Sequence, residues 1–335
     1  MDIAIDLGSS RTAIYLETRG KVLDSASVVA CDSTEERVLA VGDEAYNMIG
    51  KTPAGITAEY PIEGGVITNS RLAERMVSAM LRQAADFRVS LPRVVASVPC
   101  GLTEVEKRAV INTVSVAGAR KVFLLESPKA AAIGCGVDIT APKGTMAAVI
   151  GAGTADIGVI SLGGLTVSRS TRRAGRAMDS AIVDYVRDKY RLMIGENMAE
   201  RCKKEIGCVK PFEEERVFRV KGRDTVSGLP SYADIGSGEI STAIIPVAMG
   251  IVSEIKSALE NTPPELVGDI STEGILLTGG LAALSGLGKL VSEQTGLRVK
   301  VHKFAADCVI MGCGKALRMI PEAERGESTS PLVVI

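Results

Sequence analysis

The segment MAAVIGAGTADIGVI, residues 146–160, decides the fold. Two apolar runs flank a tip made of Gly151, Ala152, Gly153 and Thr154, which is the pattern of two buried strands joined by a tight turn. The amino terminus repeats the pattern, because DIAIDLGSSRTAIYL (residues 2–16) also places glycine and small hydroxyl residues between two apolar runs. Such a repeat indicates an internal duplication.

The duplication extends beyond the hairpins. Each hairpin is later followed by a strand, a turn, a helix, a second strand and a helix of small residues. These segments fall at 94–98, 103–117, 121–125 and 128–134 in the first half, and at 274–278, 282–295, 298–301 and 309–317 in the second. We therefore predict an α/β protein of two facing lobes, each a βββαβα core with an inserted subdomain.

Composition agrees with two lobes and excludes some partners. A chain of 335 residues is long for a single hydrophobic core. The 39 basic residues balance the 40 acidic residues to a net charge of −1, so no cationic field attracts nucleic acid, and we expect no nucleic-acid partner.

The cysteines and the single histidine give no metal-binding pattern. The first residues carry neither a basic region nor a long apolar stretch, so we expect an unexported cytoplasmic chain with reduced thiols. No two cysteines are spaced as C-x-x-C and the only histidine is His302, so we expect no zinc site and thiols that serve as packing. The cysteines are Cys31, Cys100, Cys135, Cys202, Cys208, Cys308 and Cys313.

The hairpin tips suit an anion. A turn of glycine and small hydroxyl residues presents backbone N–H groups without side-chain obstruction, and two facing tips can bracket a polyphosphate. LTGG at residues 277–280, at the start of an expected helix, adds a third such turn. Taken singly, each glycine is explained by an ordinary turn, but the repetition favours a polyphosphate site.

At this point the chain resembles the bacterial actin homologue MreB and its paralogues, within the superfamily of actin, heat-shock chaperone ATPases and sugar kinases. The resemblance runs from Ile3 to about Leu317. Its anchors are IDLG (5–8), NMIGKTP (47–53), PRVV (92–95), TEVEKR (103–108), AAAIG (130–134), ISLGG (160–164), TPPEL (262–266) and LTGG (277–280).

The resemblance implies an actin-like fold with ATP or ADP in a cleft between the lobes. It also implies polymerisation into paired protofilaments under the cell membrane, where the family organises wall synthesis and rod shape.

The implied subdomains are IA (1–31 and 76–140), IB (32–75), IIA (141–180 and 241–320) and IIB (181–240), followed by a mobile tail (321–335) whose apolar end could dock on a partner. The implied nucleotide-binding residues are Asp6, Gly8, Ser9, Ser10 and Arg11 at the first tip, Gly151, Ala152, Gly153 and Thr154 at the second, Glu200 and Lys203 on the adenosine-side helix, and Gly279, Gly280 and Leu281 at the adenosine motif.

Two departures from the family pattern affect hydrolysis. Val149 replaces an Asp that helps hold hydrated Mg²⁺, so Mg²⁺ is doubtful and Asp6 would hold it only through water. Ser127 replaces the Glu that activates the attacking water, and a hydroxyl has no useful basicity. Glu126 is one residue away at a strand end, where a shift of one position reverses the side chain, so we do not expect it to substitute. We predict weak or absent ATP hydrolysis.

Further departures add positive charge. Arg11 replaces an Asn, Arg176 and Ala177 replace acidic residues, and Leu281 replaces a third glycine. Arg11 and Arg176 are expected either to neutralise phosphate in place of Mg²⁺, or to pair with Asp6 or Asp156 and close an empty cleft; as ordinary surface residues they would do neither.

The expected function is therefore that of an MreB-like cytoskeletal filament with little or no hydrolysis. The alternatives are a working ATPase with nucleotide-cycled filaments, and a non-polymerising pseudo-actin that regulates a paralogue. Expected partners are further copies of the chain and MreB paralogues. A weak contact with the inner face of the membrane through Phe87, Val89 and Leu91 is weighed against an ordinary helix-to-strand connection.

Overall fold

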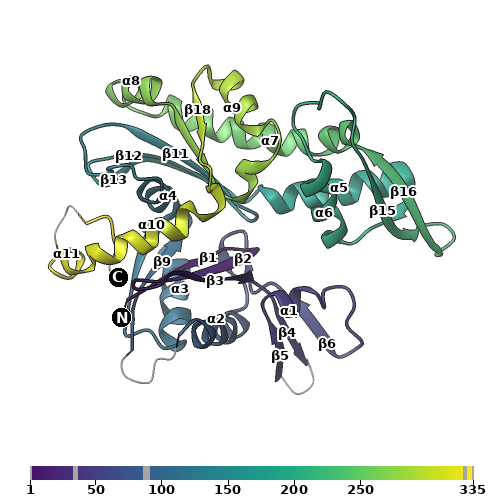
Figure 1. Cartoon of the computed structure of the whole chain (residues 1–335), viewed down its shortest axis with the longest axis horizontal. Helices are drawn as coiled ribbons and strands as arrows, with labels where there is room; N and C mark the ends of the chain where they lie inside the picture. The colour runs from purple at the N-terminus through teal and green to yellow at the C-terminus, as the bar shows by residue number, and fades with distance from the viewer. Residues whose placement is uncertain (1, 33–36, 86–90, 327–329, 334–335) are drawn as a thin grey trace.

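The structure is a computed structural model that describes residues 2–32, 37–85, 91–326 and 330–333. Figure 1 shows two lobes, each built around a five-stranded sheet, with a smaller extension from each lobe on the same side of the molecule.

The first lobe is centred on the sheet β10-β9-β1-β2-β3. Its strands are β1 (Ile3–Leu7), β2 (Arg11–Leu16), β3 (Gly20–Ala26), β9 (Arg93–Val98) and β10 (Lys121–Glu126). Side chains alternate between its faces: Ile3 and Ile5 pack with α2 (Ser70–Ala84) and α3 (Glu104–Val116), whereas Ala4 faces α4 (Ser127–Gly134) and α10 (Cys308–Ala316). A capping box begins α3, with Thr103 Oγ1 accepting from the backbone N–H of Glu106.

The second lobe repeats the first. Its sheet, β13-β12-β11-β17-β18, has the same antiparallel and parallel pairings in the same order, so the predicted duplication is confirmed. The strands are β11 (Thr145–Ile150), β12 (Ala155–Ser161), β13 (Gly164–Thr171), β17 (Ile275–Thr278) and β18 (Val299–Val301). The helices of this lobe are α5 (Gly175–Tyr190), α7 (Ser237–Glu260), α8 (Pro264–Glu273) and α9 (Leu287–Thr295).

One predicted helix is wrong. Residues 282–295 do not form a continuous helix but a 3₁₀ turn, Gly280–Ala283, followed by α9. The break falls at Gly286, whose φ of 82° lies in the left-handed region, and Ser285 there forms a bridge with Cys208.

The two extensions are small sheets. In the first lobe β4 (Val29–Asp32), β5 (Arg37–Val41) and β6 (Ile56–Glu59) pair in the order β5-β4-β6, next to α1 (Asp43–Tyr46) and the hairpin of β7 (Ile62–Glu63) and β8 (Val66–Ile67). In the second lobe β14 (Leu192–Met193), β15 (Val217–Asp224) and β16 (Pro230–Gly236) form a sheet that packs with α6 (Glu196–Ile206).

The described part of the C-terminal tail differs from the expected mobile segment. It begins with α11 (Ile320–Glu324), and Val333 then exchanges two backbone hydrogen bonds with Leu124 of β10. Leu332 is buried, so the apolar end that was expected to be available for a partner packs on the first lobe.

Among the described residues, α7 is long and apolar enough to cross a membrane by length and composition. The core helices of globular proteins pass the same test. Ile244, Val247 and Ile251 of α7 are buried in the core of the second lobe, so its apolar character is explained by packing.

The two lobes share a third core between their sheets. It contains residues of both sheets, including Ala4 and Val149, and is filled by α4 and α10. Here the backbones of the two helices nearly touch, because a Cβ on Gly134 would overlap the carbonyl oxygen of Cys308 and a Cβ on Gly312 would overlap that of Ala130. Glycine is therefore needed at both positions.

This close approach gives a stability prediction. Gly134→Ala should lower the free energy of unfolding by about 1–3 kcal/mol, because the added methyl group forces α4 away from α10. Gly250→Ala is the matched control: Gly250 lies exposed in α7 with no neighbour within 4 Å of an added Cβ, so this change should raise stability by about 0.5–1 kcal/mol. Urea unfolding measures both, and equal effects of the two substitutions would contradict the packing explanation.

Candidate functional site

The two glycine-bearing tips meet in the cleft between the lobes. The β1–β2 turn carries Ser9 and the β11–β12 turn carries Gly153, and a Cβ on Gly153 would overlap the hydroxyl of Ser9. Ser9 Oγ accepts a hydrogen bond of 2.9 Å from the backbone N–H of Gly65, which holds the first tip against the β7–β8 turn. The sequence thus folds into two opposed turns that approach within van der Waals contact.

The tips border a cavity of about 700 Å³, a volume typical of small-molecule sites. Nearly all the sequence-predicted residues line it: Asp6, Gly8, Ser9, Ser10, Arg11, Ser127, Gly151, Ala152, Gly153, Thr154, Asp156, Glu200, Lys203, Gly279, Gly280 and Leu281. Glu126 and Arg176 are not among the lining residues.

The cavity also includes residues that sequence reasoning missed. Phe212 and Arg216 line it, with the Arg216 guanidinium 4.1 Å from the centre of the Phe212 ring. Asp24, Tyr46, Leu284 and Asp307 line it as well. These residues belong to none of the glycine motifs, so no local pattern in this one sequence marks them.

A buried ion pair connects two helices at the wall of the cavity. Lys203 of α6 lies 2.7 Å from a carboxylate oxygen of Asp179 in α5 and donates to the carbonyl oxygen of Gly175 at 2.9 Å. Burial raises the pKa of Asp179 to about 6, although the Lys203 ammonium favours its ionised form. Lys203 therefore joins α5 to α6 beneath the cavity.

Hydrogen bonds cross from one lobe to the other at two places in the cleft. The hydroxyl of Tyr46, in the extension of the first lobe, donates to Glu200 of α6 at 2.8 Å. The backbone N–H of Cys100, which follows β9, donates to Asp156 of β12 at 3.0 Å. The cleft is thus bridged at its outer edge and at its base.

The carboxylates of Asp6 and Asp156 differ in the number of hydrogen bonds that they accept. Burial raises the pKa of Asp6 to about 6, against a short hydrogen bond from Ser97 to one of its oxygens. Asp156 accepts from Ser170, Thr154 and the backbone N–H of Cys100, and burial still raises its pKa. Asp6 therefore keeps an oxygen without a hydrogen bond among the described residues, whereas both oxygens of Asp156 are bonded.

The two positions at which the resemblance implies acidic side chains hold none here. Val149 lines the cavity with an aliphatic side chain, and Ser127 Oγ donates to the carbonyl oxygen of Val98 at 3.0 Å. Glu126 does not line the cavity and lies 2.7 Å from the ammonium of Lys129, which also donates to the carbonyl oxygen of Pro331. The shift of one position does direct Glu126 away from the cleft, as strand geometry requires.

The expected pairing of the arginines with Asp6 or Asp156 is wrong. Arg11 begins β2 at its exposed end, beside β3, and pairs with Asp24 at 2.6 Å and Asp43 at 3.1 Å. Asp156 is buried and Asp6 is half-buried, and the partners of the Arg11 guanidinium are Asp24 and Asp43 instead.

Arg176 spans the cleft. Its guanidinium donates to the carbonyl oxygen of Ser9 at 2.6 Å and stacks 3.6 Å from the centre of the Tyr60 ring. The guanidinium therefore connects α5 of the second lobe with the tip and the extension of the first.

The residues fit a nucleotide better than they fit Mg²⁺. A Cβ on Gly279, whose φ is +89°, would overlap the carbonyl oxygen of Ile150, so the third turn also runs directly against the second tip. All three turns line one cavity with glycine and small side chains, which suits a nucleotide. For a divalent cation beside the two tips, Val149 has no oxygen and Asp156 is already bonded, which leaves Asp6 as the carboxylate of the strands that carry the tips.

Comparison with known proteins identifies relatives over the whole length. The sequence matches the model of the MreB/Mbl protein family over residues 1–325. It is 43% identical over 325 residues to the cell shape-determining protein MreB of Escherichia coli, which covers 95% of this chain and 94% of that protein.

Solved structures of other proteins have the same fold as this chain. The crystal structure of MreB5 of Spiroplasma citri bound to AMPPNP is similar with a TM-score of 0.92 and 34% identity, over 97% of this chain and 98% of that one. The MamK double helical filament shares the fold, with a TM-score of 0.79 and 21% identity over 96% of this chain and 99% of that one.

The raised pKa of Asp6 predicts a pH-dependent stability. In the folded chain Asp6 keeps its proton up to about pH 6, whereas the unfolded chain loses it near pH 4, so the free energy of unfolding falls as pH rises through this interval. Asp6→Asn stays neutral and should be about 1–3 kcal/mol more stable than the native chain above pH 6, with the difference vanishing below pH 4. Urea unfolding of the nucleotide-free chain across this pH range measures it.

Asp24→Asn is the control of opposite sign. Hydrogen bonds from Arg11 and Lys21 lower the pKa of Asp24 despite its partial burial, so its replacement should destabilise the chain at neutral pH. An Asp6→Asn variant that is no more stable than the native chain at neutral pH would refute the account of Asp6.

Proposed function

The chain belongs to the MreB/Mbl family, and on that premise we propose that it is an actin-like cytoskeletal protein that binds ATP or ADP between its lobes, forms filaments and hydrolyses ATP slowly or not at all. The single observation that carries the loss of hydrolysis is the environment of Ser127. A general base must lie within hydrogen-bond reach of the water it activates, and Ser127 supplies a weakly acidic hydroxyl that is engaged with Val98.

The opposed tips and the third turn support nucleotide binding. The β and γ phosphates would lie against the Ser9 and Gly153 turns, which line the cavity with small side chains. The adenosine would lie near Lys203, Arg216 and Gly280, which line the same cavity. The AMPPNP bound to MreB5 of Spiroplasma citri supports this assignment by similarity.

The charge pattern of the cleft supports slow turnover. When bound, Mg²⁺ supplies neutralisation of phosphate charge, and here Asp6 would hold it through water at most. Arg176 is not available for that task, because its guanidinium is bonded to the carbonyl oxygen of Ser9 and stacked on Tyr60. The remaining contribution of the protein is to bind and orient the triphosphate.

Filament formation is supported by the family and by the fold. The MamK structure is a double helical filament, and this chain has the same fold. We propose self-association into paired protofilaments in the cytoplasm, with a role in cell shape as the name of the Escherichia coli relative suggests. MreB paralogues are the proposed further partners.

A weak contact with the inner face of the membrane is part of the proposal. Leu91 lies in the connection between α2 and β9, just before β9. Its side chain is 55% exposed, which suits insertion into a lipid surface. Phe87 and Val89 lie outside the described residues. Three apolar side chains contribute at most a few kcal/mol, so attachment would depend on many copies in one filament.

Release of phosphate from purified protein tests the proposal. We expect turnover at least about 100-fold slower than that of Escherichia coli MreB under the same conditions, with filaments that sediment in ATP. Ser127→Glu combined with Val149→Asp restores both missing carboxylates and should raise turnover at least about 10-fold.

The substitution Glu126→Gln tests the alternative function, a working ATPase in which Glu126 is the base. If Glu126 acts as the base, this change abolishes turnover, whereas we expect it to leave the residual rate unchanged in protein whose circular dichroism is native. Turnover of the native chain at the rate of Escherichia coli MreB would refute the loss of hydrolysis. Absence of any sedimenting polymer, with or without nucleotide, would instead indicate the non-polymerising pseudo-actin.

A further inference from the structure

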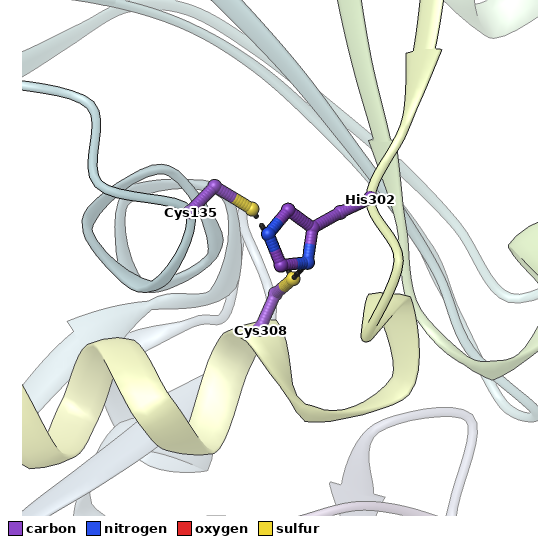
Figure 2. Close-up of side chains that lie close together, drawn as sticks. All are labelled: Cys135, His302 and Cys308. Atoms are coloured by element: carbon purple, nitrogen blue, oxygen red, sulfur yellow. Dashed lines mark hydrogen bonds between the residues drawn. The ribbon is translucent and has the colours of Figure 1, made fainter.

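Three side chains that are far apart in the sequence gather outside the nucleotide cavity. Figure 2 shows Cys135, His302 and Cys308 pointing toward one another. The two sulfur atoms are 3.1 Å apart, and Cys308 Sγ lies 3.2 Å from His302 Nδ1. This pair of thiols meets the chain's only histidine, a proximity that the spacing of the cysteines did not predict.

The three residues come from separate elements that the fold holds rigidly. Cys135 directly follows α4, Cys308 begins α10, and His302 directly follows β18. The glycine contact between α4 and α10 fixes the two sulfur atoms, since a Cβ on Gly134 would overlap the carbonyl oxygen of Cys308. The imidazole is fixed by the backbone N–H of Phe304, which donates to Nδ1 at 3.1 Å.

We propose that Cys135, His302 and Cys308 form a three-ligand binding site for Zn²⁺. Thiolate and imidazole are the ligands that zinc prefers in proteins, and the potential ligand atoms all lie within 4.8 Å of one another. The site is independent of the proposed nucleotide function, because none of the three residues lines the nucleotide cavity.

The present hydrogen bonds show how the ion would enter. The proton between the two sulfur atoms and the contact of Cys308 with His302 occupy the space that a cation would take. Binding through Nδ1 would also replace the hydrogen bond from the Phe304 N–H, because this nitrogen has a single lone pair. A tetrahedral zinc ion holds two sulfur ligands about 3.8 Å apart and a sulfur and a nitrogen about 3.5 Å apart, so the ligand atoms need to separate by about 0.3–0.7 Å. Side-chain rotation provides such a shift.

Charge and access also favour the ion. Binding converts both thiols to thiolates and releases two protons to solvent, so Zn²⁺, two thiolates and a neutral imidazole form a group without net charge. A neutral group is acceptable in this half-buried place, where an unpaired thiolate is not. Cys135 and His302 are half-buried rather than enclosed, so an ion and a fourth ligand from solvent can reach the site.

The ion would reinforce the joint between the lobes. It would link the end of α4 to the segment that leads from β18 into α10, next to the cleft wall. The neighbours of Cys308 in the sequence, Asp307 and Val309, line the nucleotide cavity.

Spectroscopic titration with Co²⁺, a substitute for Zn²⁺ with visible absorption, tests the site on the reduced, metal-free full chain under anaerobic conditions. We expect a thiolate-to-cobalt charge-transfer band that saturates at one ion per chain and is abolished by Zn²⁺. Cys135→Ser, at a half-buried position, should weaken Zn²⁺ binding at least about 100-fold while the chain stays folded. His302→Gln should weaken binding and shift the ligand-field bands, because a nitrogen ligand is lost.

Cys31→Ser is the matched control. Cys31 is also half-buried and hydrogen-bonded, to Thr57, but it lies in β4 of the first extension, so its replacement should leave the affinity unchanged. Absence of the charge-transfer band at one equivalent would overturn the proposal. Unchanged Zn²⁺ affinity in Cys135→Ser would overturn it too, as would a disulfide between Cys135 and Cys308 that persists under reducing conditions and prevents binding.

Discussion

The close approach of α4 and α10 is the constraint on which the rest of the structure depends. The two helices fill the core shared by both sheets, and Gly134 and Gly312 allow their backbones to meet. Because α4 begins at Ser127, directly after β10, this contact also sets the wall of the cleft where the family carries its base. The same contact brings Cys135 and Cys308 together. One packing contact thus positions both the nucleotide cavity and the proposed zinc site.

Hydrogen bonds join the two lobes across the cleft, and the same cleft contains a carboxylate whose surroundings disfavour its charged form. Tyr46 and Arg176 connect the lobes through hydrogen bonds to Glu200 and to the backbone of Ser9. Asp6, by contrast, is buried with a raised pKa, which lowers the stability of the folded chain at neutral pH. A group kept at a cost to stability is typical of a binding site, and Asp6 lies at the end of the strand that leads into the first tip. The near-neutral net charge of the chain therefore says nothing about this local arrangement.

The sequence predicted what local pattern and repetition determine. Alternating apolar residues and the duplicated hairpin tips gave the two lobes, and matching motifs placed the residues that line the cavity. Features that depend on tertiary contact were missed. The partners of Arg11 are Asp24 and Asp43, on a neighbouring strand and helix. The meeting of His302 with two cysteines depends on the packing of three separate elements, which no spacing along the chain encodes.

The central claim is that this cleft holds ATP without consuming it. The most direct measurement is the structure of the filament after incubation with ATP and Mg²⁺, rather than with an analogue, for the time in which Escherichia coli MreB hydrolyses its ATP. The account predicts intact ATP, with its γ-phosphate against the turn of Ser9 and the turn of Gly153. Density for ADP alone in this cavity would contradict it.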